Sequence, residues 1–243
     1  MPILSKIGDT NPFLHVTLKQ GEKVFAESDA MVMMDANLEL VGRMQGGFLN
    51  SLARKIVNDE SLFLQEMAAN NGEGDALFAA AAPGDLEILD VGEKQYIVND
   101  GAFVLCTEKV EMSAELQNPI NALFGGTGGF VITKTKGFGQ IVVAGLGTVF
   151  SIDVTPGKDV IVDNFHVVAW DSALTYKPSI TTGAPKNIFK SMLQSQLTGE
   201  GIVTRFSGLG KVYICSRNPK SFADFIKGMA GKTSTQRASG SGL

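Results

Sequence analysis

One segment of this chain occurs three times, and that repetition constrains the fold more than any other feature of the sequence. Residues 24–40, 96–112 and 160–176 align without a gap. Each copy begins with an apolar-rich triplet, passes through a polar turn and continues into four apolar residues, at 31–34, 103–106 and 167–170. A unit that repeats at this period cannot bury its apolar face alone, so we expect the copies to pack on one another.

Matching markers lie on both sides of each copy. A short alternating strand is predicted upstream, at residues 14–16, 86–88 and 150–152. A Gly-x-Gly motif and an apolar stretch follow downstream, at residues 72–78, 137–143 and 208–214. Because β-type residues follow each Gly-x-Gly, we interpret it as a structural turn or bulge and not as a phosphate site. The spacing between markers varies only where loops absorb insertions, which is typical of duplicated β units.

The predicted fold is all-β, with three tandem β-sandwich or double-stranded β-helix-like repeats in a pseudo-threefold arrangement and short capping helices. The first β repeat is predicted at residues 13–84, and the second at residues 85–148. The third, at residues 149–230, includes a C-terminal helix. Apart from Ala238, residues 231–243 have no apolar side chain before the last position, so we predict a disordered tail.

Helical spacing of apolar residues appears between the predicted strands. It predicts helical excursions at residues 48–56, 120–124 and 188–193. A better helix follows Asn218, a candidate N-cap, and Pro219, which suits the first helical position. Its apolar face consists of Phe222, Phe225, Ile226 and Met229.

Two interpretations of these helices remain open. They cap open sheet edges and cover the core. Alternatively, the first two excursions expose apolar side chains to a partner or to a membrane surface. In the second case the candidate interaction residues are Phe48, Leu49, Leu52, Ile120, Leu123 and Phe124.

The sequence offers no constellation that points to catalysis, and we predict that the protein is not an enzyme. His15 and His166 occupy different positions in their repeats and lack the spacing of a metal pair, so we expect hydrogen-bonded structural roles. Cys106 and Cys215 each lie in an apolar run and are expected to be buried, reduced thiols. We assign no catalytic, cofactor-binding or metal-binding residue, and no cofactor.

Charge and hydropathy restrict the partners and the location. The 25 acidic and 21 basic residues are mixed along the chain, with a net charge of −4, so we expect no nucleic-acid partner. The amino-terminal residues do not have the pattern of a secretory signal, and no apolar stretch approaches the roughly 20 residues of a spanning helix. We therefore predict a cytoplasmic protein.

Several segments resemble the widespread bacterial family related to altered inheritance of mitochondria protein twenty-four. They are residues 60–64, 96–98 with 101–103, 198–203 and, most specifically, 206–214. The resemblance covers residues 10 to 228, and it differs from the family pattern at Leu209, where proline is common, and at Cys215-Ser216, where Gln-Thr is common. It implies a fold similar to the tryptophan RNA-binding attenuation protein, without transferring tryptophan or RNA binding. Eukaryotic relatives are mitochondrial and linked to inner-membrane organisation, whereas bacterial members are uncharacterised.

The sequence therefore predicts a non-enzymatic scaffold or protein-interaction protein, with possible peripheral contact to a membrane surface. The alternative is a small-molecule-binding module that uses clefts between the repeats. Because adjacent β units leave edges and apolar faces, we also predict a homo-oligomer, with a trimer as the first guess. The identity of a protein partner is left open.

Overall fold

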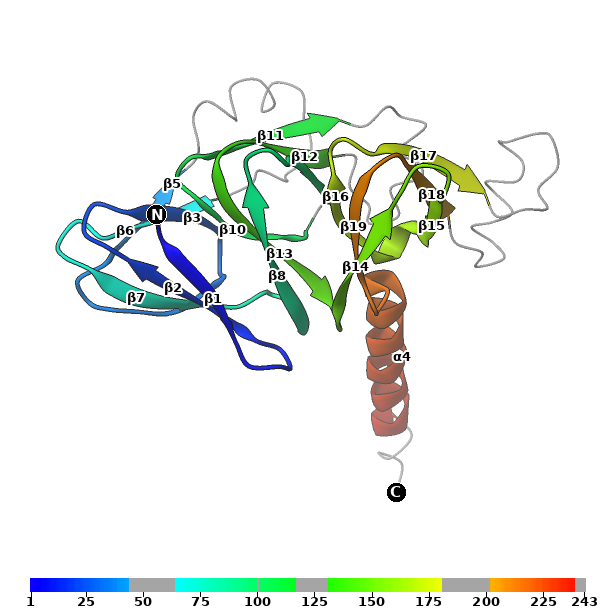
Figure 1. Cartoon of the computed structure of the whole chain (residues 1–243). Coiled ribbons are helices and arrows are strands. Elements are labelled where there is room, and N and C mark those ends of the chain that lie inside the picture. The colour runs from blue at the N-terminus through cyan, green and yellow to red at the C-terminus, as the bar shows by residue number, and fades with distance from the viewer. Residues whose placement is uncertain (44–63, 100, 117–130, 181–201, 239–243) are drawn as a thin grey trace.

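The computed structural model describes residues 1–43, 64–99, 101–116, 131–180 and 202–238. The described part of the chain is mostly β-strand (Figure 1). It contains four sheets, one 3-10 helix and one α-helix, and every pairing between named strands is antiparallel. The predicted all-β character is confirmed at this level.

The first sheet has the strand order β1-β2-β7-β4. Its members are β1 (Ile3–Ile7), β2 (Phe13–Leu18), β7 (Gly74–Phe78) and β4 (Met31–Met34). Strand β2 alternates in the way that a strand with one buried face should, because Leu14, Val16 and Leu18 are fully buried whereas Phe13 is exposed. This sheet therefore has one face on the core and one face toward solvent.

The second and third sheets have six strands each, in the orders β5-β6-β3-β10-β13-β8 and β11-β12-β9-β16-β19-β14. The second comprises β5 (Glu39–Arg43), β6 (Leu64–Ala68), β3 (Lys23–Glu27), β10 (Phe103–Thr107), β13 (Gly139–Leu146) and β8 (Gly84–Val91). The third comprises β11 (Val110–Leu116), β12 (Val131–Gly137), β9 (Tyr96–Val98), β16 (Val167–Asp171), β19 (Gly210–Cys215) and β14 (Val149–Val154). The fourth sheet has the order β15-β18-β17, with β15 (Val160–Asp163), β18 (Ile202–Ser207) and β17 (Thr175–Ile180).

Three strands each have a β-bulge: β4 where it pairs with β7, β10 where it pairs with β13, and β16 where it pairs with β19. The register shifts between Met31 and Met33 in β4, between Phe103 and Leu105 in β10, and between Val167 and Ala169 in β16. These are the same aligned positions of the repeated segment. A bulge places two successive side chains on one face of its strand, and here it does so at the start of each apolar run.

Three apolar clusters form the core, and the six-stranded sheets separate them. In the second sheet, Val24 and Leu105 belong to the first cluster, whereas Phe25 and Cys106 face the second. In the third sheet, Tyr96 belongs to the second cluster, and Ile97 and Trp170 belong to the third. Strands in the middle of these two sheets are therefore buried on both faces, which explains their nearly continuous apolar sequences.

The Gly-x-Gly motifs lie at turns, as predicted, and each turn joins two strands of different sheets: β6 to β7, β12 to β13 and β18 to β19. The first glycine of each has a positive φ, at Gly72, Gly137 and Gly208. The second glycine lies opposite the end of the upstream strand, in the pairs Leu18 with Gly74, Val91 with Gly139, and Val154 with Gly210. Counted from these pairs, Leu14 corresponds to Glu87 and not to Leu86. The predicted match of the upstream strands is therefore wrong by one residue in the second copy.

Helix α4 (Pro219–Ala238) projects away from the sheets (Figure 1). The Ser221 amide donates a hydrogen bond to Oδ1 of Asn218 at 3.1 Å, which confirms the predicted N-cap. The helix continues past Gly231, where the sequence predicted a disordered tail to begin, because adding a residue to an existing helix costs less than starting one. The predicted helical excursions at 48–56, 120–124 and 188–193 lie outside the described residues.

Candidate interaction surface

Both histidines are held by hydrogen bonds, as predicted. His15 Nε2 lies 2.9 Å from Oδ1 of Asp75, which also accepts a 2.6 Å hydrogen bond from the Thr17 hydroxyl. The hydrogen bond from Thr17, followed by that from His15, lowers the pKa of Asp75 below its ordinary value. His166 donates from Nδ1 to the carbonyl oxygen of Cys215 at 2.7 Å. These contacts give each imidazole a structural role.

Both cysteines are buried free thiols, as the sequence predicted. Burial raises the pKa of the Cys106 thiol to about 12, so almost none of it is thiolate at neutral pH. Burial also raises the pKa of Cys215, whose thiol donates to the Arg217 carbonyl at 3.3 Å. Because the thiolate is the nucleophile, neither side chain is prepared for nucleophilic chemistry.

The acidic and metal-ligating residues of the described chain do not gather. Within the five described ranges, no group of three or more His, Cys, Asp or Glu residues has a geometry that could hold a metal ion. The carboxylates instead form separate contacts at the surface. For example, Lys6 pairs with Asp85 at 2.9 Å, and the Arg205 Nε lies 2.8 Å from Asp159.

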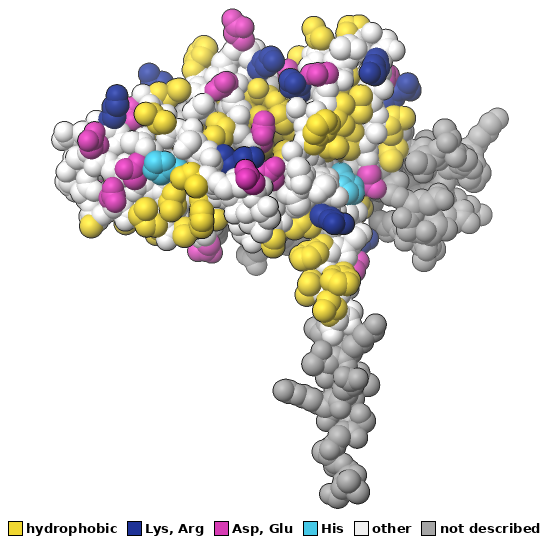
Figure 2. Space-filling view, turned by 60° about the horizontal axis from the view of Figure 1, so that its bottom comes forward, with side chains coloured by type: hydrophobic (Ala, Val, Ile, Leu, Met, Phe, Trp, Pro, Cys, Tyr) yellow, Lys and Arg dark blue, Asp and Glu magenta, His cyan; other side chains and the backbone are white. Residues whose placement is uncertain are grey.

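Exposed apolar side chains do gather, along one side of α4. We call Phe222, Phe225, Ile226 and Met229 the α4 stripe; each is more than two-fifths exposed. Their spacing of three, one and three residues places them on one face of the helix. In the space-filling view, apolar side chains cover the part of the helix nearest the body (Figure 2). The predicted apolar face therefore exists, but the expectation that this helix caps a sheet edge or the core is wrong, because the face is exposed.

Contacts at the start of α4 attach it to the sheets. Lys220 Nζ lies 5.6 Å from the centre of the Phe165 ring, a cation–π contact with the 3-10 helix η1 (Asn164–His166). The Asp163 carboxylate accepts from the Phe165 amide at 2.9 Å and thereby fixes the turn that carries the ring. The first turn of α4 is thus positioned by η1 and by strand β19 of the third sheet, which ends at Cys215 shortly before the helix begins.

The charges on the described turns of α4 are mostly positive. Lys220 and Lys227 are exposed on the helix together with a single acidic residue, Asp224. By sequence alone, Pro219–Ala238 contains four basic residues and one acidic residue, although the whole chain has a net charge of −4. The helix is therefore a locally basic and apolar element on an acidic protein.

Two other exposed apolar residues lie at turns between strands. Phe138 and Leu209 are the middle residues of two Gly-x-Gly turns and are among the most exposed apolar side chains. The aligned residue of the remaining turn is Glu73, so the apolar character is not shared. Isolated exposed residues are normal on protein surfaces, whereas a stripe on one helix is not.

The six interaction residues predicted from the sequence, Phe48, Leu49, Leu52, Ile120, Leu123 and Phe124, lie outside the described residues. Their role stays a prediction. The sequence did identify the α4 stripe, through its helical spacing, but assigned it a capping role.

Comparison with known proteins gives one family match. The model of the family described as Mitochondrial biogenesis AIM24 matches residues 4–217. An uncharacterized protein of Streptococcus pyogenes serotype M6 is 33% identical over 222 residues, covering 89% of this chain and 86% of that protein. The crystal structure of a Streptococcus pyogenes protein superposes with a TM-score of 0.75 at 30% identity, covering 93% of this chain and 99% of that one. The family match ends before α4 begins.

Proposed function

This chain belongs to the Mitochondrial biogenesis AIM24 family, and from that premise we propose that it is a non-enzymatic scaffold whose α4 stripe contacts the surface of a membrane. The observation that carries the proposal is the exposure of four apolar side chains on one face of a helix that projects from the body (Figures 1 and 2). Burying such a face removes apolar surface from water, which lowers the free energy by about 25 cal/mol per Å² of buried apolar surface.

The chemistry of α4 favours a lipid surface as the occupant. Helices that lie in the membrane interface combine an apolar face that carries Phe or Leu with Lys and Arg on the polar face. Phe222 and Phe225 supply the first feature, and Lys220 and Lys227 supply the second. Anionic headgroups attract basic residues by about 1 kcal/mol each near the surface. Within the described residues no helix is long and apolar enough to cross a membrane, so the contact proposed is peripheral.

A vesicle-binding assay tests this proposal. The full chain is mixed with vesicles of phosphatidylcholine alone or of phosphatidylcholine with phosphatidylglycerol, and the bound fraction is measured after sedimentation. We expect binding to the anionic vesicles, weaker binding to the neutral ones, and loss of binding in the double variant Phe225→Ser, Ile226→Ser. Because both side chains are exposed, the double variant should keep the thermal stability of the sheets.

The matched control is Phe138→Ser, which removes an equally apolar and highly exposed side chain from the turn between β12 and β13. It should bind vesicles as the wild type does. Equal loss of binding in Phe138→Ser would mean that general surface hydrophobicity drives the interaction. No binding of the wild type to either vesicle would reject the membrane surface as the occupant of the α4 stripe.

We further propose that the strands form three tandem units, as the repeated sequence predicts. The support is that β2–β7–β4, β8–β13–β10 and β14–β19–β16 follow the same order, with bulges at aligned positions. The pseudo-threefold arrangement and the similarity to the tryptophan RNA-binding attenuation protein stay predictions from the sequence. The small-molecule alternative also stays a prediction, since no contact among the described residues favours it.

A further inference from the structure

In the described sheets, two strands each have an open edge: β4 in the first sheet and β15 in the fourth. Within the chain, β3 pairs with β10 and β9 pairs with β16, and these two antiparallel pairings create the six-stranded sheets. By sequence alignment β4 corresponds to β10 and β16, and β15 corresponds to β3 and β9. In the described sheets, however, β4 is the last strand of the first sheet and β15 is the last strand of the fourth. Each strand therefore lacks the second partner that its counterparts have.

The side chains at the two open edges are exposed where their counterparts are buried. Val32 and Met33 of β4 are 52% and 41% exposed, and Ile161 of β15 is 59% exposed. The residues aligned with them in the two internal pairings are all less than a tenth exposed: Val104 and Val168, Leu105 and Ala169, Phe25 and Ile97. The same positions thus form core at an internal pairing and bare apolar surface at the two ends.

The composition of these edges also sets them apart. Strand β4 consists of four apolar residues, and β15 has three apolar residues before Asp163. Of the other sheet-terminal strands, β5 has charged residues at its two ends, and the rest carry them further inside, such as Lys6 in β1, Glu111 in β11 and Lys177 in β17. Charged residues on an edge strand discourage pairing with another chain. Strand β4 has no such protection.

We propose that copies of this chain assemble head to tail, with β4 of one copy paired antiparallel with β15 of the next. The internal pairings place Ala26 opposite Leu105 and Val98 opposite Ala169. The equivalent register sets Val162 opposite Met33 of the second copy, Ile161 opposite Met34, and Val160 opposite Asp35. The occupant of each edge is a second copy because this kind of pairing, here called a joint, already occurs twice within the chain, at β3–β10 and at β9–β16. In the described sheets, β4 and β15 are the two strands that a further joint would pair.

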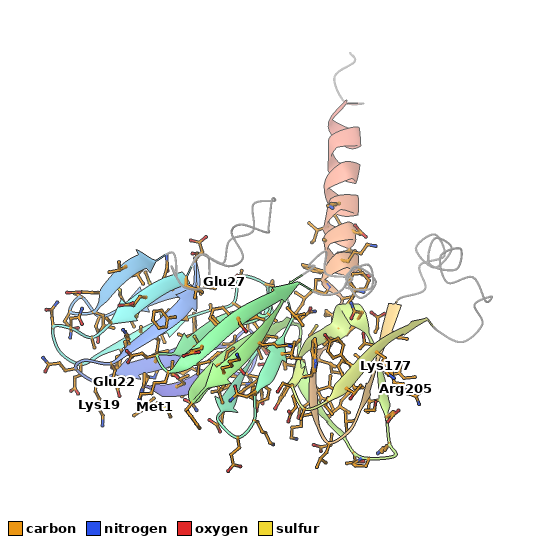
Figure 3. All side chains as sticks on the ribbon, turned by 90° about the horizontal axis from the view of Figure 1, so that it is seen from above. Met1, Lys19, Glu22, Glu27, Lys177 and Arg205 are labelled. Atoms are coloured by element: carbon orange, nitrogen blue, oxygen red, sulfur yellow. The ribbon has the colours of Figure 1, made fainter. Side chains whose placement is uncertain are left out.

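Pairing of β4 with β15 inside one copy does not occur in this structure. The sheet that holds β4 lies at one end of the molecule and β15 at the other, with the second sheet between them (Figure 1). Figure 3 shows the same separation, with Met1 and Glu22 near the first sheet and Lys177 and Arg205 on the fourth. Since the two contacting surfaces differ, the assembly closes into a ring or continues as a filament according to the rotation at each joint. The proposal goes beyond membrane contact and does not involve α4.

Charge placed on one edge at a time tests the proposal. In Met33→Lys the β4 edge is blocked and the β15 edge is intact; in Ile161→Lys the reverse holds. Light scattering after size-exclusion chromatography should show wild-type assemblies and a 25.8 kDa monomer for each variant alone. An equal mixture of the two variants should form one joint and therefore a dimer of twice that mass. The control Val41→Lys, on the exposed end strand β5, should assemble as the wild type does.

Cross-linking checks the register in the same mixture. Val160→Cys is added to the Met33→Lys chain, and Asp35→Cys to the Ile161→Lys chain, so that the two new thiols face each other at the joint. An oxidised heterodimer should form in the mixture and in neither chain alone. The native thiols do not interfere, because Cys106 and Cys215 are buried.

Four results would overturn the head-to-tail assembly. The first is a wild type that stays monomeric at every concentration tested. The second is dimerisation of Ile161→Lys alone, which would show that β4 pairs with another β4. The third is a mixture of the two variants that stays monomeric. The fourth is loss of assembly in Val41→Lys, which would show that added charge acts without regard to the edge. Circular dichroism of each variant establishes that its sheets are folded.

Discussion

Backbone conformation at single glycines fixes the turns that organise the sheets. Gly137 has a φ of +90°, and a Cβ atom there would collide with the carbonyl oxygen of Lys109. Glycine is the one residue that reaches this conformation without strain. A single residue also shows how the interior affects reactivity, because burial alone keeps the Cys106 thiol protonated.

We expect Gly137→Ala to lower the free energy of unfolding by about 1–3 kcal/mol, through a strained backbone and the collision with Lys109. Gly42→Ala is the control, because a Cβ at Gly42 has open space and an ordinary φ. That change should be neutral or slightly stabilising. Urea denaturation of both variants provides the comparison, and equal stability of the two would contradict the role given to Gly137.

Asp75 should make the stability of the first sheet depend on pH in acid. Its pKa in the folded state lies below the ordinary 3.8 because of the hydrogen bonds from Thr17 and His15. A lowered pKa stabilises the fold above 3.8, and this contribution is lost as the pH falls through the folded-state pKa. The wild type should therefore lose more stability than Asp75→Asn between neutral pH and strong acid, by at most about 1 kcal/mol after solvent screening. Parallel acid dependence of the two proteins would contradict this.

Elements differ in how much of them the sequence determines. The N-cap and the apolar face of α4 follow from Asn218 and from helical spacing, and both were predictable. What the apolar face contacts was not, because an amphipathic pattern says that a helix has an apolar side and not what covers it. Strand β8 shows a second limit. Leu86 packs in the first core cluster and Leu89 in the second, so its apolar residues do not alternate and its register was misassigned by one residue.

Removing the cap tests whether α4 is an independent element. We expect Asn218→Ala to destabilise the helix by about 1 kcal/mol, because the Ser221 amide loses its acceptor. Far-ultraviolet circular dichroism should show reduced helix content, while the main thermal transition of the sheets stays where it is. A matching drop in that transition would instead mean that α4 and the sheets unfold together.

At the scale of the whole molecule, the strands of the repeated segment fall into two groups. Four of them pair with a strand of another copy, as β3 does with β10 and β9 with β16, and two are end strands of the described sheets. Strands in the middle of the series are buried on both faces, and their side chains form three core clusters. The ends of the series, at β4 and β15, keep the apolar residues of a joint without a neighbour in the described sheets. Helix α4 adds an apolar and basic surface outside the sheets. These surfaces are where we expect the protein to act.

Hydrogen–deuterium exchange of the full chain, with and without anionic vesicles, tests the central claim most directly. Amides of α4 should exchange more slowly when vesicles are present, because the bound helix is held at the lipid surface and opens less often. Amides of the four sheets should exchange at the same rate in both conditions. Slower exchange in the sheets with no change in α4, or no change anywhere, would contradict the proposal that this helix is the contacting surface.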